Sequence, residues 1–259
     1  MHNLLQISDC HLVVPGRLLI GVDTQASLEA VLEQATSEQK PDAVIASGDL
    51  AHDPKPDVYA RFLETIRAYT AAPLLCLPGN HDVLAAMDCL PQKPLSMGKW
   101  GIVPFDSHED DSTPALVTEA DRRTAAAAIM ESEAEFLLIA THHPLLAVGA
   151  PWIDGHRIQN PEELVQWLSE SSRLRNENRQ SRLKAMVFGH AHQEVAGDCA
   201  NVPVFGTPST CFQFEPQSEK FALDDAHPGY RWLTLDDAGE ISTEVHRVDS
   251  FDINPVLKR

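Results

Sequence analysis

Short apolar runs alternate with longer amphipathic segments along the first third of the chain. The apolar runs at residues 3–8, 43–46 and 74–77 have the length of buried strands. Between them, residues 23–38 and a segment that begins near Pro56 carry apolar side chains at helical spacing. Strand, helix, strand, helix, strand is the beginning of a parallel α/β sheet. This pattern predicts an α/β fold.

The rest of the chain continues with less regularly spaced strand-like runs. Further strands are predicted at residues 101–107, 136–140, 184–188, 202–205, 231–235 and 241–248. Residues 125–130 lie in a predicted helix, and Asn160 followed three residues later by Glu163 predicts a capped helix start. The later strands are predicted to be antiparallel, so residues 206–259 are expected to complete a second sheet. Because no repeat or linker interrupts the sequence, residues 1–259 are predicted to form a single domain.

The composition restricts the classes of partner. The 259 residues carry a formal net charge of −18, which argues against binding a nucleic acid polymer or an anionic membrane. A small anionic substrate remains compatible with this charge if bound cations reverse its sign locally. No apolar run approaches the roughly 20 residues of a membrane span, and the early first strand leaves no room for a signal peptide. The five cysteines show no paired spacing, which predicts reduced thiols in a cytoplasmic protein.

Five of the apolar runs are followed at once by polar side chains that can bind metals or transfer protons. These side chains are Asp9 and His11, Asp49, Asn80 and His81, His142 or His143, and His190 and His192. Each one alone could be a turn residue or an ordinary hydrogen-bonding residue. The carboxyl ends of parallel strands lie at one edge of a sheet, where ligands bind in α/β folds. Because all five sets occur at such ends, a shared functional site is the better interpretation.

The chemistry of this set indicates two divalent cations. Two carboxylates, one amide and four imidazoles exceed the closed, usually cysteine-rich set of four ligands in a structural zinc site. A mixed oxygen and nitrogen set with Asp49 as the bridging carboxylate fits iron, manganese or zinc, with open positions for water. Two such ions about 3.5–4 Å apart would hold a phosphoryl group and generate hydroxide near neutral pH.

The polar residues form five short motifs in a fixed order. They are Asp9-x-His11, Gly48-Asp49, Gly79-Asn80-His81-Asp82, His142-x-Pro144 and Gly189-His190-x-His192. In this order they resemble the motifs of the calcineurin-like metallophosphoesterases, and most closely those of the bacterial class III 3′,5′-cyclic AMP phosphodiesterases. The resemblance covers nearly the whole chain, including residues 206–214, 228–232 and 243–247. It implies a four-layer α-β-β-α sandwich of two mixed sheets, with a dinuclear metal site at the strand ends.

The resemblance also implies the roles of individual residues. One metal would be held by Asp9, His11, Asp49 and His192, and the second by Asp49, Asn80, His142 and His190. The family pattern is His-x-Pro, so His142 is the expected ligand and His143 has a supporting or packing role. His81 is at the position of a histidine that contacts the phosphate without binding a metal, and it is the expected catalytic residue. Substrate contacts are expected from His11, Asp49, Asn80, His81 and His192.

The sequence leaves alternatives open for the residues around these ligands. Asp82 is expected to orient the side chain of Asn80 or His81, whereas Asp53 either orients His81 or is a solvated loop carboxylate. Side chains alternate along a strand, so Cys10 should point away from the metals. Residues 106–119 lack the glycine-containing pattern of the subfamily, and the resemblance therefore assigns no contacts there.

The sequence thus predicts a cytoplasmic phosphodiesterase that uses two divalent ions, iron or manganese with zinc as an alternative, to hydrolyse 3′,5′-cyclic AMP to 5′-AMP. The same chemistry on another small phosphoester and a non-catalytic scaffold are the alternatives. A homodimer is an alternative to a monomer. The loop with Trp152 and the pair Phe212 and Phe214 are expected to hold the base, although the two phenylalanines are equally interpretable as core.

Overall fold

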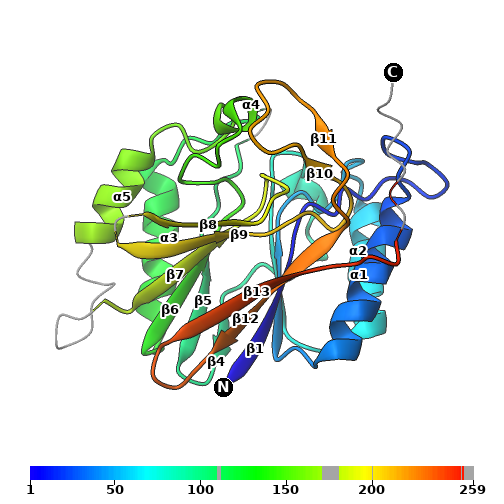
Figure 1. The fold of residues 1–259 in the computed structure, drawn as a ribbon. Coiled ribbons are helices and arrows are strands. Elements are labelled where there is room, and N and C mark those ends of the chain that lie inside the picture. Colours follow the sequence, from blue (N-terminus) through cyan, green and yellow to red (C-terminus); the bar gives the residue numbers. More distant parts are fainter. Residues whose placement is uncertain (110–111, 171–180, 200, 252, 254–259) are drawn as a thin grey trace.

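Two β-sheets packed face to face, with helices on their outer faces, make up the fold (Figure 1). The arrangement is the four-layer sandwich of two mixed sheets that the sequence predicts. This computed structural model describes residues 1–109, 112–170, 181–199, 201–251 and 253. None of the helices described has the length and apolarity of a membrane span.

The first sheet joins the N-terminal strands to the C-terminal ones. Its strands lie in the order β13 (Ile241–Arg247), β12 (Gly229–Leu235), β1 (His2–Ile7), β2 (Ala43–Ser47) and β3 (Leu74–Leu77). Strands β1, β2 and β3 are parallel, whereas β12 is antiparallel to β1, and β13 is antiparallel to β12. Helices α1 (Thr24–Glu38) and α2 (Pro56–Tyr69) pack on its outer face. The Asp23 carboxylate accepts two backbone N–H bonds and caps α1.

The second sheet is built from the middle of the chain. Its strands lie in the order β4 (Leu95–Met97), β5 (Trp100–Pro104), β6 (Phe136–Ala140), β7 (Leu183–Phe188), β9 (Val202–Gly206) and β8 (Val195–Cys199). Strands β5, β6, β7 and β9 are parallel. Its outer face is covered by α3 (Glu119–Glu131) and α5 (Pro161–Glu170). The short elements are η1 (Leu84–Ala86), α4 (Pro151–Asp154), β10 (Gln213–Phe214) and β11 (Leu223–Asp224).

A buried apolar layer fills the space between the two sheets. It contains Leu4 and Ile45 from the first sheet and Leu138 and Val187 from the second, all fully buried. Side chains alternate along a strand, so Leu5 of β1 points the other way and packs against α1 and α2. The inner layer holds the carboxyl ends of both sets of parallel strands at the same end of the molecule.

This inner layer gives a stability prediction. Leu138→Ala should lower the free energy of unfolding by about 2–5 kcal/mol, because it removes buried methyl groups and leaves a cavity. The matched control is Leu116→Ala, whose side chain is 52% exposed and which should change stability by no more than about 0.5 kcal/mol. Urea denaturation followed by circular dichroism measures both. Equal effects of the two substitutions would contradict this description of the core.

Most predicted elements occur where the sequence places them. The helix predicted over residues 23–38 is α1, the helix predicted from Pro56 is α2, and residues 125–130 lie within α3. The helix predicted after Asn160 begins at Pro161, although the Asn160 side chain accepts from the backbone of Val117. Every predicted strand is present within a residue or a few of its expected ends. Four short strands, β4, β8, β10 and β11, were not predicted.

The predicted position of the C-terminal strands is wrong. Residues after 206 do not complete the second sheet, because β12 pairs with β1 and β13 pairs with β12 in the first sheet. The burial pattern explains the choice of sheet. Leu233 and Leu235 enter the layer between the sheets, while Tyr230 and Trp232 pack beside α1 and α2. An alternating strand of this kind specifies two buried faces but does not specify which sheet edge it joins.

Candidate metal centre

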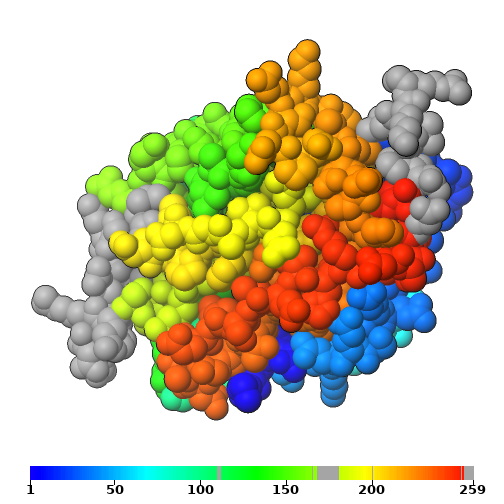
Figure 2. Space-filling view, in the orientation of Figure 1, coloured from blue at the N-terminus to red at the C-terminus, as the bar shows by residue number. Residues whose placement is uncertain are grey.

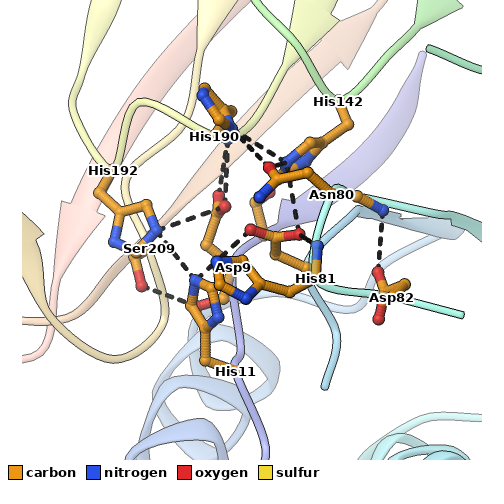
Figure 3. Close-up of polar contacts among 12 residues, drawn as sticks. Asp9, His11, Asn80, His81, Asp82, His142, His190, His192 and Ser209 are labelled. Carbon is orange, nitrogen blue, oxygen red and sulfur yellow. Dashed lines mark hydrogen bonds and ion pairs between the residues drawn. The ribbon is translucent and has the colours of Figure 1, made fainter. Parts of the chain in front are cut away.

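Seven candidate ligands from five loops converge beyond the strand ends (Figure 3). Each loop directly follows a parallel strand of one of the two sheets. Asp9 and His11 follow β1, Asp49 follows β2, Asn80 follows β3, His142 follows β6, and His190 and His192 follow β7. Because the sheets pack face to face, residues more than 180 positions apart lie next to each other.

Most of these residues have an unusual backbone conformation. The φ angles are 53° at Asp9, 44° at His11, 51° at Asp49, 63° at His190 and 49° at His192. Residues other than glycine rarely adopt this left-handed region, which costs about 1–3 kcal/mol per residue and is concentrated at functional sites. The sharp turns direct the side chains back over the strand ends and toward one another.

The first group of side chains consists of Asp9, His11, His192 and one oxygen of Asp49. His11 Nε2 lies 3.1 Å from His192 Nε2 and 3.6 Å from Asp49 Oδ2. His192 Nε2 lies 3.4 Å from Asp9 Oδ1. His192 Nδ1 donates to the backbone oxygen of Phe212 at 2.7 Å, which fixes the orientation of the ring. All of these side chains are buried.

The second group consists of Asn80, His142, His190 and the other oxygen of Asp49. His190 Nδ1 lies 2.9 Å from Asn80 Oδ1 and 3.3 Å from His142 Nε2. His142 Nε2 lies 3.5 Å from Asp49 Oδ1. His142 Nδ1 donates to the backbone oxygen of Ser47 at 2.8 Å. Asp49 therefore faces one group with each of its two oxygens.

The hydrogen bonds of the His142 and His192 rings indicate whether cations fit between these rings and the carboxylates. His142 and His192 each donate Nδ1–H to a backbone oxygen, so Nε2 of the neutral ring carries a lone pair. Each lone pair faces a carboxylate oxygen, of Asp49 or of Asp9. Two acceptors this close repel unless a proton or a cation lies between them. Histidines that bind metals typically donate their other N–H in this way, and the residues fit two divalent cations.

The electrostatics of the buried groups agree with this test. Burial opposes charge on His142, but the adjacent Asp49 carboxylate raises its pKa to about 9. Burial would raise the pKa of Asp49, yet His142 and His11 hold it well below its ordinary value. Burial lowers the pKa of His11 and of His190 well below the ordinary value, so both rings are neutral and able to bind a metal.

Two glycines are required by the close approach of these loops. A Cβ on Gly79 would lie 2.2 Å from Asp49 Oδ1, and a Cβ on Gly48 would lie 2.3 Å from His142 Nδ1. Gly48 also has a φ of 98°. The glycines of the Gly48-Asp49 and Gly79-Asn80 motifs thus give the Asp49 carboxylate and the His142 ring their positions.

His81 lies outside both groups of candidate ligands. Its ring contacts His11, with centroids 4.9 Å apart, and stacks on His52 with centroids 5.0 Å apart. Its backbone N–H donates to Asp49 Oδ1 at 2.8 Å. The side chain is exposed toward the cavity that the site opens into.

The expected role of Asp82 is wrong. Its carboxylate does not orient the side chain of Asn80 or His81; it accepts hydrogen bonds from the backbone of Leu50, Ala51 and Gly79 and from the Tyr59 hydroxyl. Burial and the charge of Asp49 raise its pKa to about 6. Asp82 therefore ties the loop after β3 to the loop after β2.

Three neighbouring residues have partners in other parts of the chain. Asp53 accepts from the backbone of Val14 and from Arg17, which favours the loop-carboxylate alternative over an interaction with His81. Cys10 is buried in the core beside α1 and α2, pointing away from the site as predicted. His143 is buried and bonded to Ser107 Oγ and to the Thr113 backbone oxygen, so it supports Ser107 and Thr113. Residues 110–111 of the 106–119 segment lie outside the described residues.

A cavity of about 290 Å³ opens directly from the metal centre. Its apolar wall consists of Leu19, Ile20, Trp152, Phe212, Phe214 and Phe221. Phe214 stacks on His192 with centroids 4.0 Å apart and contacts the edge of Trp152 at 4.8 Å. The segment around β10 and β11 (orange) lies against the segment around α4 (green) at the top of the molecule (Figure 2). Phe212 and Phe214 are both buried in a small apolar cluster and line the cavity.

Some cavity residues were not found from the sequence. Leu19, Ile20, His52 and Phe221 lie in loops far apart along the chain and belong to no motif. The only signal was the position of His52, three residues after Asp49. The cavity forms where segments far apart in the sequence meet, and local sequence patterns carry no signal of such meetings.

Comparisons with known proteins identify the family of this chain. Residues 2–194 match the calcineurin-like phosphoesterase family. The chain is 36% identical to the 3′,5′-cyclic adenosine monophosphate phosphodiesterase CpdA of Pseudomonas aeruginosa, over 95% of this chain and 90% of that protein. It is 33% identical to the protein of the same name from Escherichia coli K12, over 98% of this chain and 92% of that protein.

Solved structures share the fold at low sequence identity. A purple acid phosphatase from yellow lupin seeds superposes with a TM-score of 0.62 and 12% identity over 97% of this chain, which spans about half (52%) of that enzyme. The inner membrane complex anchor GAP50 of Plasmodium superposes with a TM-score of 0.60 and 8% identity, over 96% of this chain and 85% of that one. These likenesses concern the fold alone.

Proposed function

The chain belongs to the calcineurin-like phosphoesterase family, and on this premise we propose that it hydrolyses 3′,5′-cyclic AMP to 5′-AMP. The family fold implies a dinuclear divalent metal site. The observation that carries the proposal is the Asp49 carboxylate, which faces a different group of imidazoles with each oxygen. An apolar cavity of the size of a small ligand site adjoins these groups.

The ligand set follows from the two groups. Asp9, His11, Asp49 and His192 would hold one ion, and Asp49, Asn80, His142 and His190 would hold the other. Imidazole, carboxylate and amide donors together suit iron or manganese, with zinc as the alternative. When bound, two such ions supply charge neutralisation at the phosphoryl oxygens and a water of lowered pKa.

The chain's own residues position the substrate and move a proton. His11, Asp49, Asn80, His81 and His192 line the floor of the cavity and would surround the phosphate. The oxygen of a water molecule adds to phosphorus opposite the 3′ oxygen, and one proton of this water is released to the solvent. The bond from phosphorus to the 3′ oxygen breaks, and 5′-AMP remains. The exposed His81 imidazole would donate a proton to the departing 3′ oxygen. Its separation from both ligand groups leaves it free to do so.

Within this function, we propose that the substrate is a cyclic nucleotide. The support for this substrate is the function named for relatives such as those from P. aeruginosa and E. coli, together with the aromatic wall beside the metal centre. Aromatic rings stack on any base, so another cyclic nucleotide is the second candidate. We also propose that the protein acts in the cytoplasm as a single domain and takes a small substrate. Its net charge of −18 and its five free cysteines support this.

A substrate panel on metal-reconstituted protein tests this proposal. Cyclic AMP should be hydrolysed faster than cyclic GMP, a glycerophosphodiester and bis-nitrophenyl phosphate. Faster turnover of base-free diesters than of every cyclic nucleotide would favour a general phosphodiesterase.

The Trp152 ring gives a prediction for base recognition. Trp152 packs edge-on against Phe214 and Phe221 in the wall of the cavity. Trp152→Ala should reduce cyclic AMP hydrolysis by about 10-fold or more, since one base–aromatic stack contributes about 1–3 kcal/mol. Turnover of bis-nitrophenyl phosphate, which has no base, should change much less. Equal losses on both substrates would indicate a structural role for this tryptophan.

A further inference from the structure

A second cluster of imidazoles lies at the rim of the cavity, apart from the two ligand groups. One ring nitrogen of each of His11, His52 and His81 lies within 4.8 Å of the others. The ring centroids are 4.9 Å apart for His11 and His81, 5.0 Å for His52 and His81, and 5.8 Å for His11 and His52. Neither His52 nor His81 belongs to the dinuclear set described above.

These distances match those of imidazoles around one ion. An ion bound to one nitrogen of each ring at the zinc distance of about 2.0–2.1 Å would hold the ring centroids roughly 5 Å apart. The Nδ1 atoms of His11 and His52 are buried and have no hydrogen-bond partner among the described residues. Buried polar nitrogens normally have a partner, so these two atoms indicate a missing one.

Hydrogen bonds hold the backbone around the cluster in place. The backbone N–H of His52 donates to the Leu12 backbone oxygen at 2.9 Å. The backbone N–H of His81 donates to Asp49 Oδ1 at 2.8 Å. The cluster offers nitrogen donors and no carboxylate. Imidazole-only sites favour zinc, copper or nickel over magnesium, calcium or manganese.

We propose that His52 and His81, beside His11, bind a third divalent cation of the zinc type, and that this ion inhibits the enzyme. His11 directs Nε2 to the first ligand group, so it can meet the third ion only through Nδ1, after the proton on Nδ1 has been released to the solvent. Water completes the coordination, and the site fills only when zinc is in excess of the dinuclear centre. A cation on the His81 imidazole occupies the nitrogen that transfers the proton. The inhibition, unlike the binding, rests on the proposed function.

Equilibrium dialysis of the full chain against buffered free Zn²⁺ tests the binding. Bound zinc per chain should rise to two and then, at higher free zinc, to three. His52→Phe keeps an aromatic ring on His81 but removes both nitrogens, and His52→Gln is a second variant without a ring. Both should weaken the third equivalent by about 10-fold or more, since even outer-shell changes cost a metal site 10–100-fold. The matched control is His156→Phe, which removes another histidine of the same cavity and should keep the third equivalent.

Inhibition by zinc is the second measurement. In His52→Phe, the zinc concentration for half-inhibition, measured relative to the turnover of the same variant without added zinc, should rise with the change in binding. A wild-type plateau at two zinc ions, or a third equivalent that is unchanged in both His52 variants or lost equally in His156→Phe, would overturn the site. Dialysis needs no substrate. A protein that binds the third ion but hydrolyses no cyclic nucleotide would therefore refute the proposed function and not the site.

Discussion

Asp49→Ala is expected to abolish both metal binding and all measurable turnover. The carboxylate faces His11 with Oδ2 at 3.6 Å and His142 with Oδ1 at 3.5 Å, so it is shared by both ligand groups. Elemental analysis of the purified variant and an assay on cyclic AMP measure the two effects.

Asp53→Ala is the matched control for this substitution. It removes a carboxylate four residues further along the same loop, whose partners are Val14 and Arg17. This variant should keep both metals and most of the activity. If wild-type protein is fully active with no more than one tightly held metal per chain, the dinuclear assignment fails.

His81→Ala should keep the metal content and lose about 10²–10⁴-fold in rate, the usual contribution of a positioned general acid. The ring lies outside both ligand groups and contacts only the edge of His11 within them. The loss should be smaller for a nitrophenyl ester, because this leaving group departs without protonation. Rates on the two substrates, with metal analysis of the same preparation, make the comparison.

Two outcomes would refute this role of His81. A loss of equal size on cyclic AMP and on the nitrophenyl ester would show that the residue does not protonate the leaving group. A loss of metal would show that His81 belongs to the ligand set.

The sequence predicts which loops carry the candidate ligands better than it predicts which strands lie at the edges of the two sheets. Asp9, Asp49 and Asn80 each follow an apolar run within a few residues, and parallel strands necessarily bring their carboxyl ends together. The strand predictions depend on the same local signal. The edge that β12 joins depends instead on contacts between residues more than 200 positions apart, such as Leu5 with Trp232.

The roles of the supporting residues depend on similar long-range contacts. The sequence places Asp82 beside Asn80 and His81, but the bends of two loops turn its carboxylate toward Leu50 and Ala51. His52 meets His81 only because β2 and β3 are neighbours in the sheet. The cavity wall likewise combines Trp152 with Phe221, which no spacing pattern links.

Chromatography of the products from cyclic AMP tests the central claim most directly. Protein reconstituted with manganese or iron should convert cyclic AMP to 5′-AMP, with no 3′-AMP, and a metal chelator should stop the reaction. Dominant 3′-AMP, or no conversion by protein with two metals bound per chain, would contradict the account.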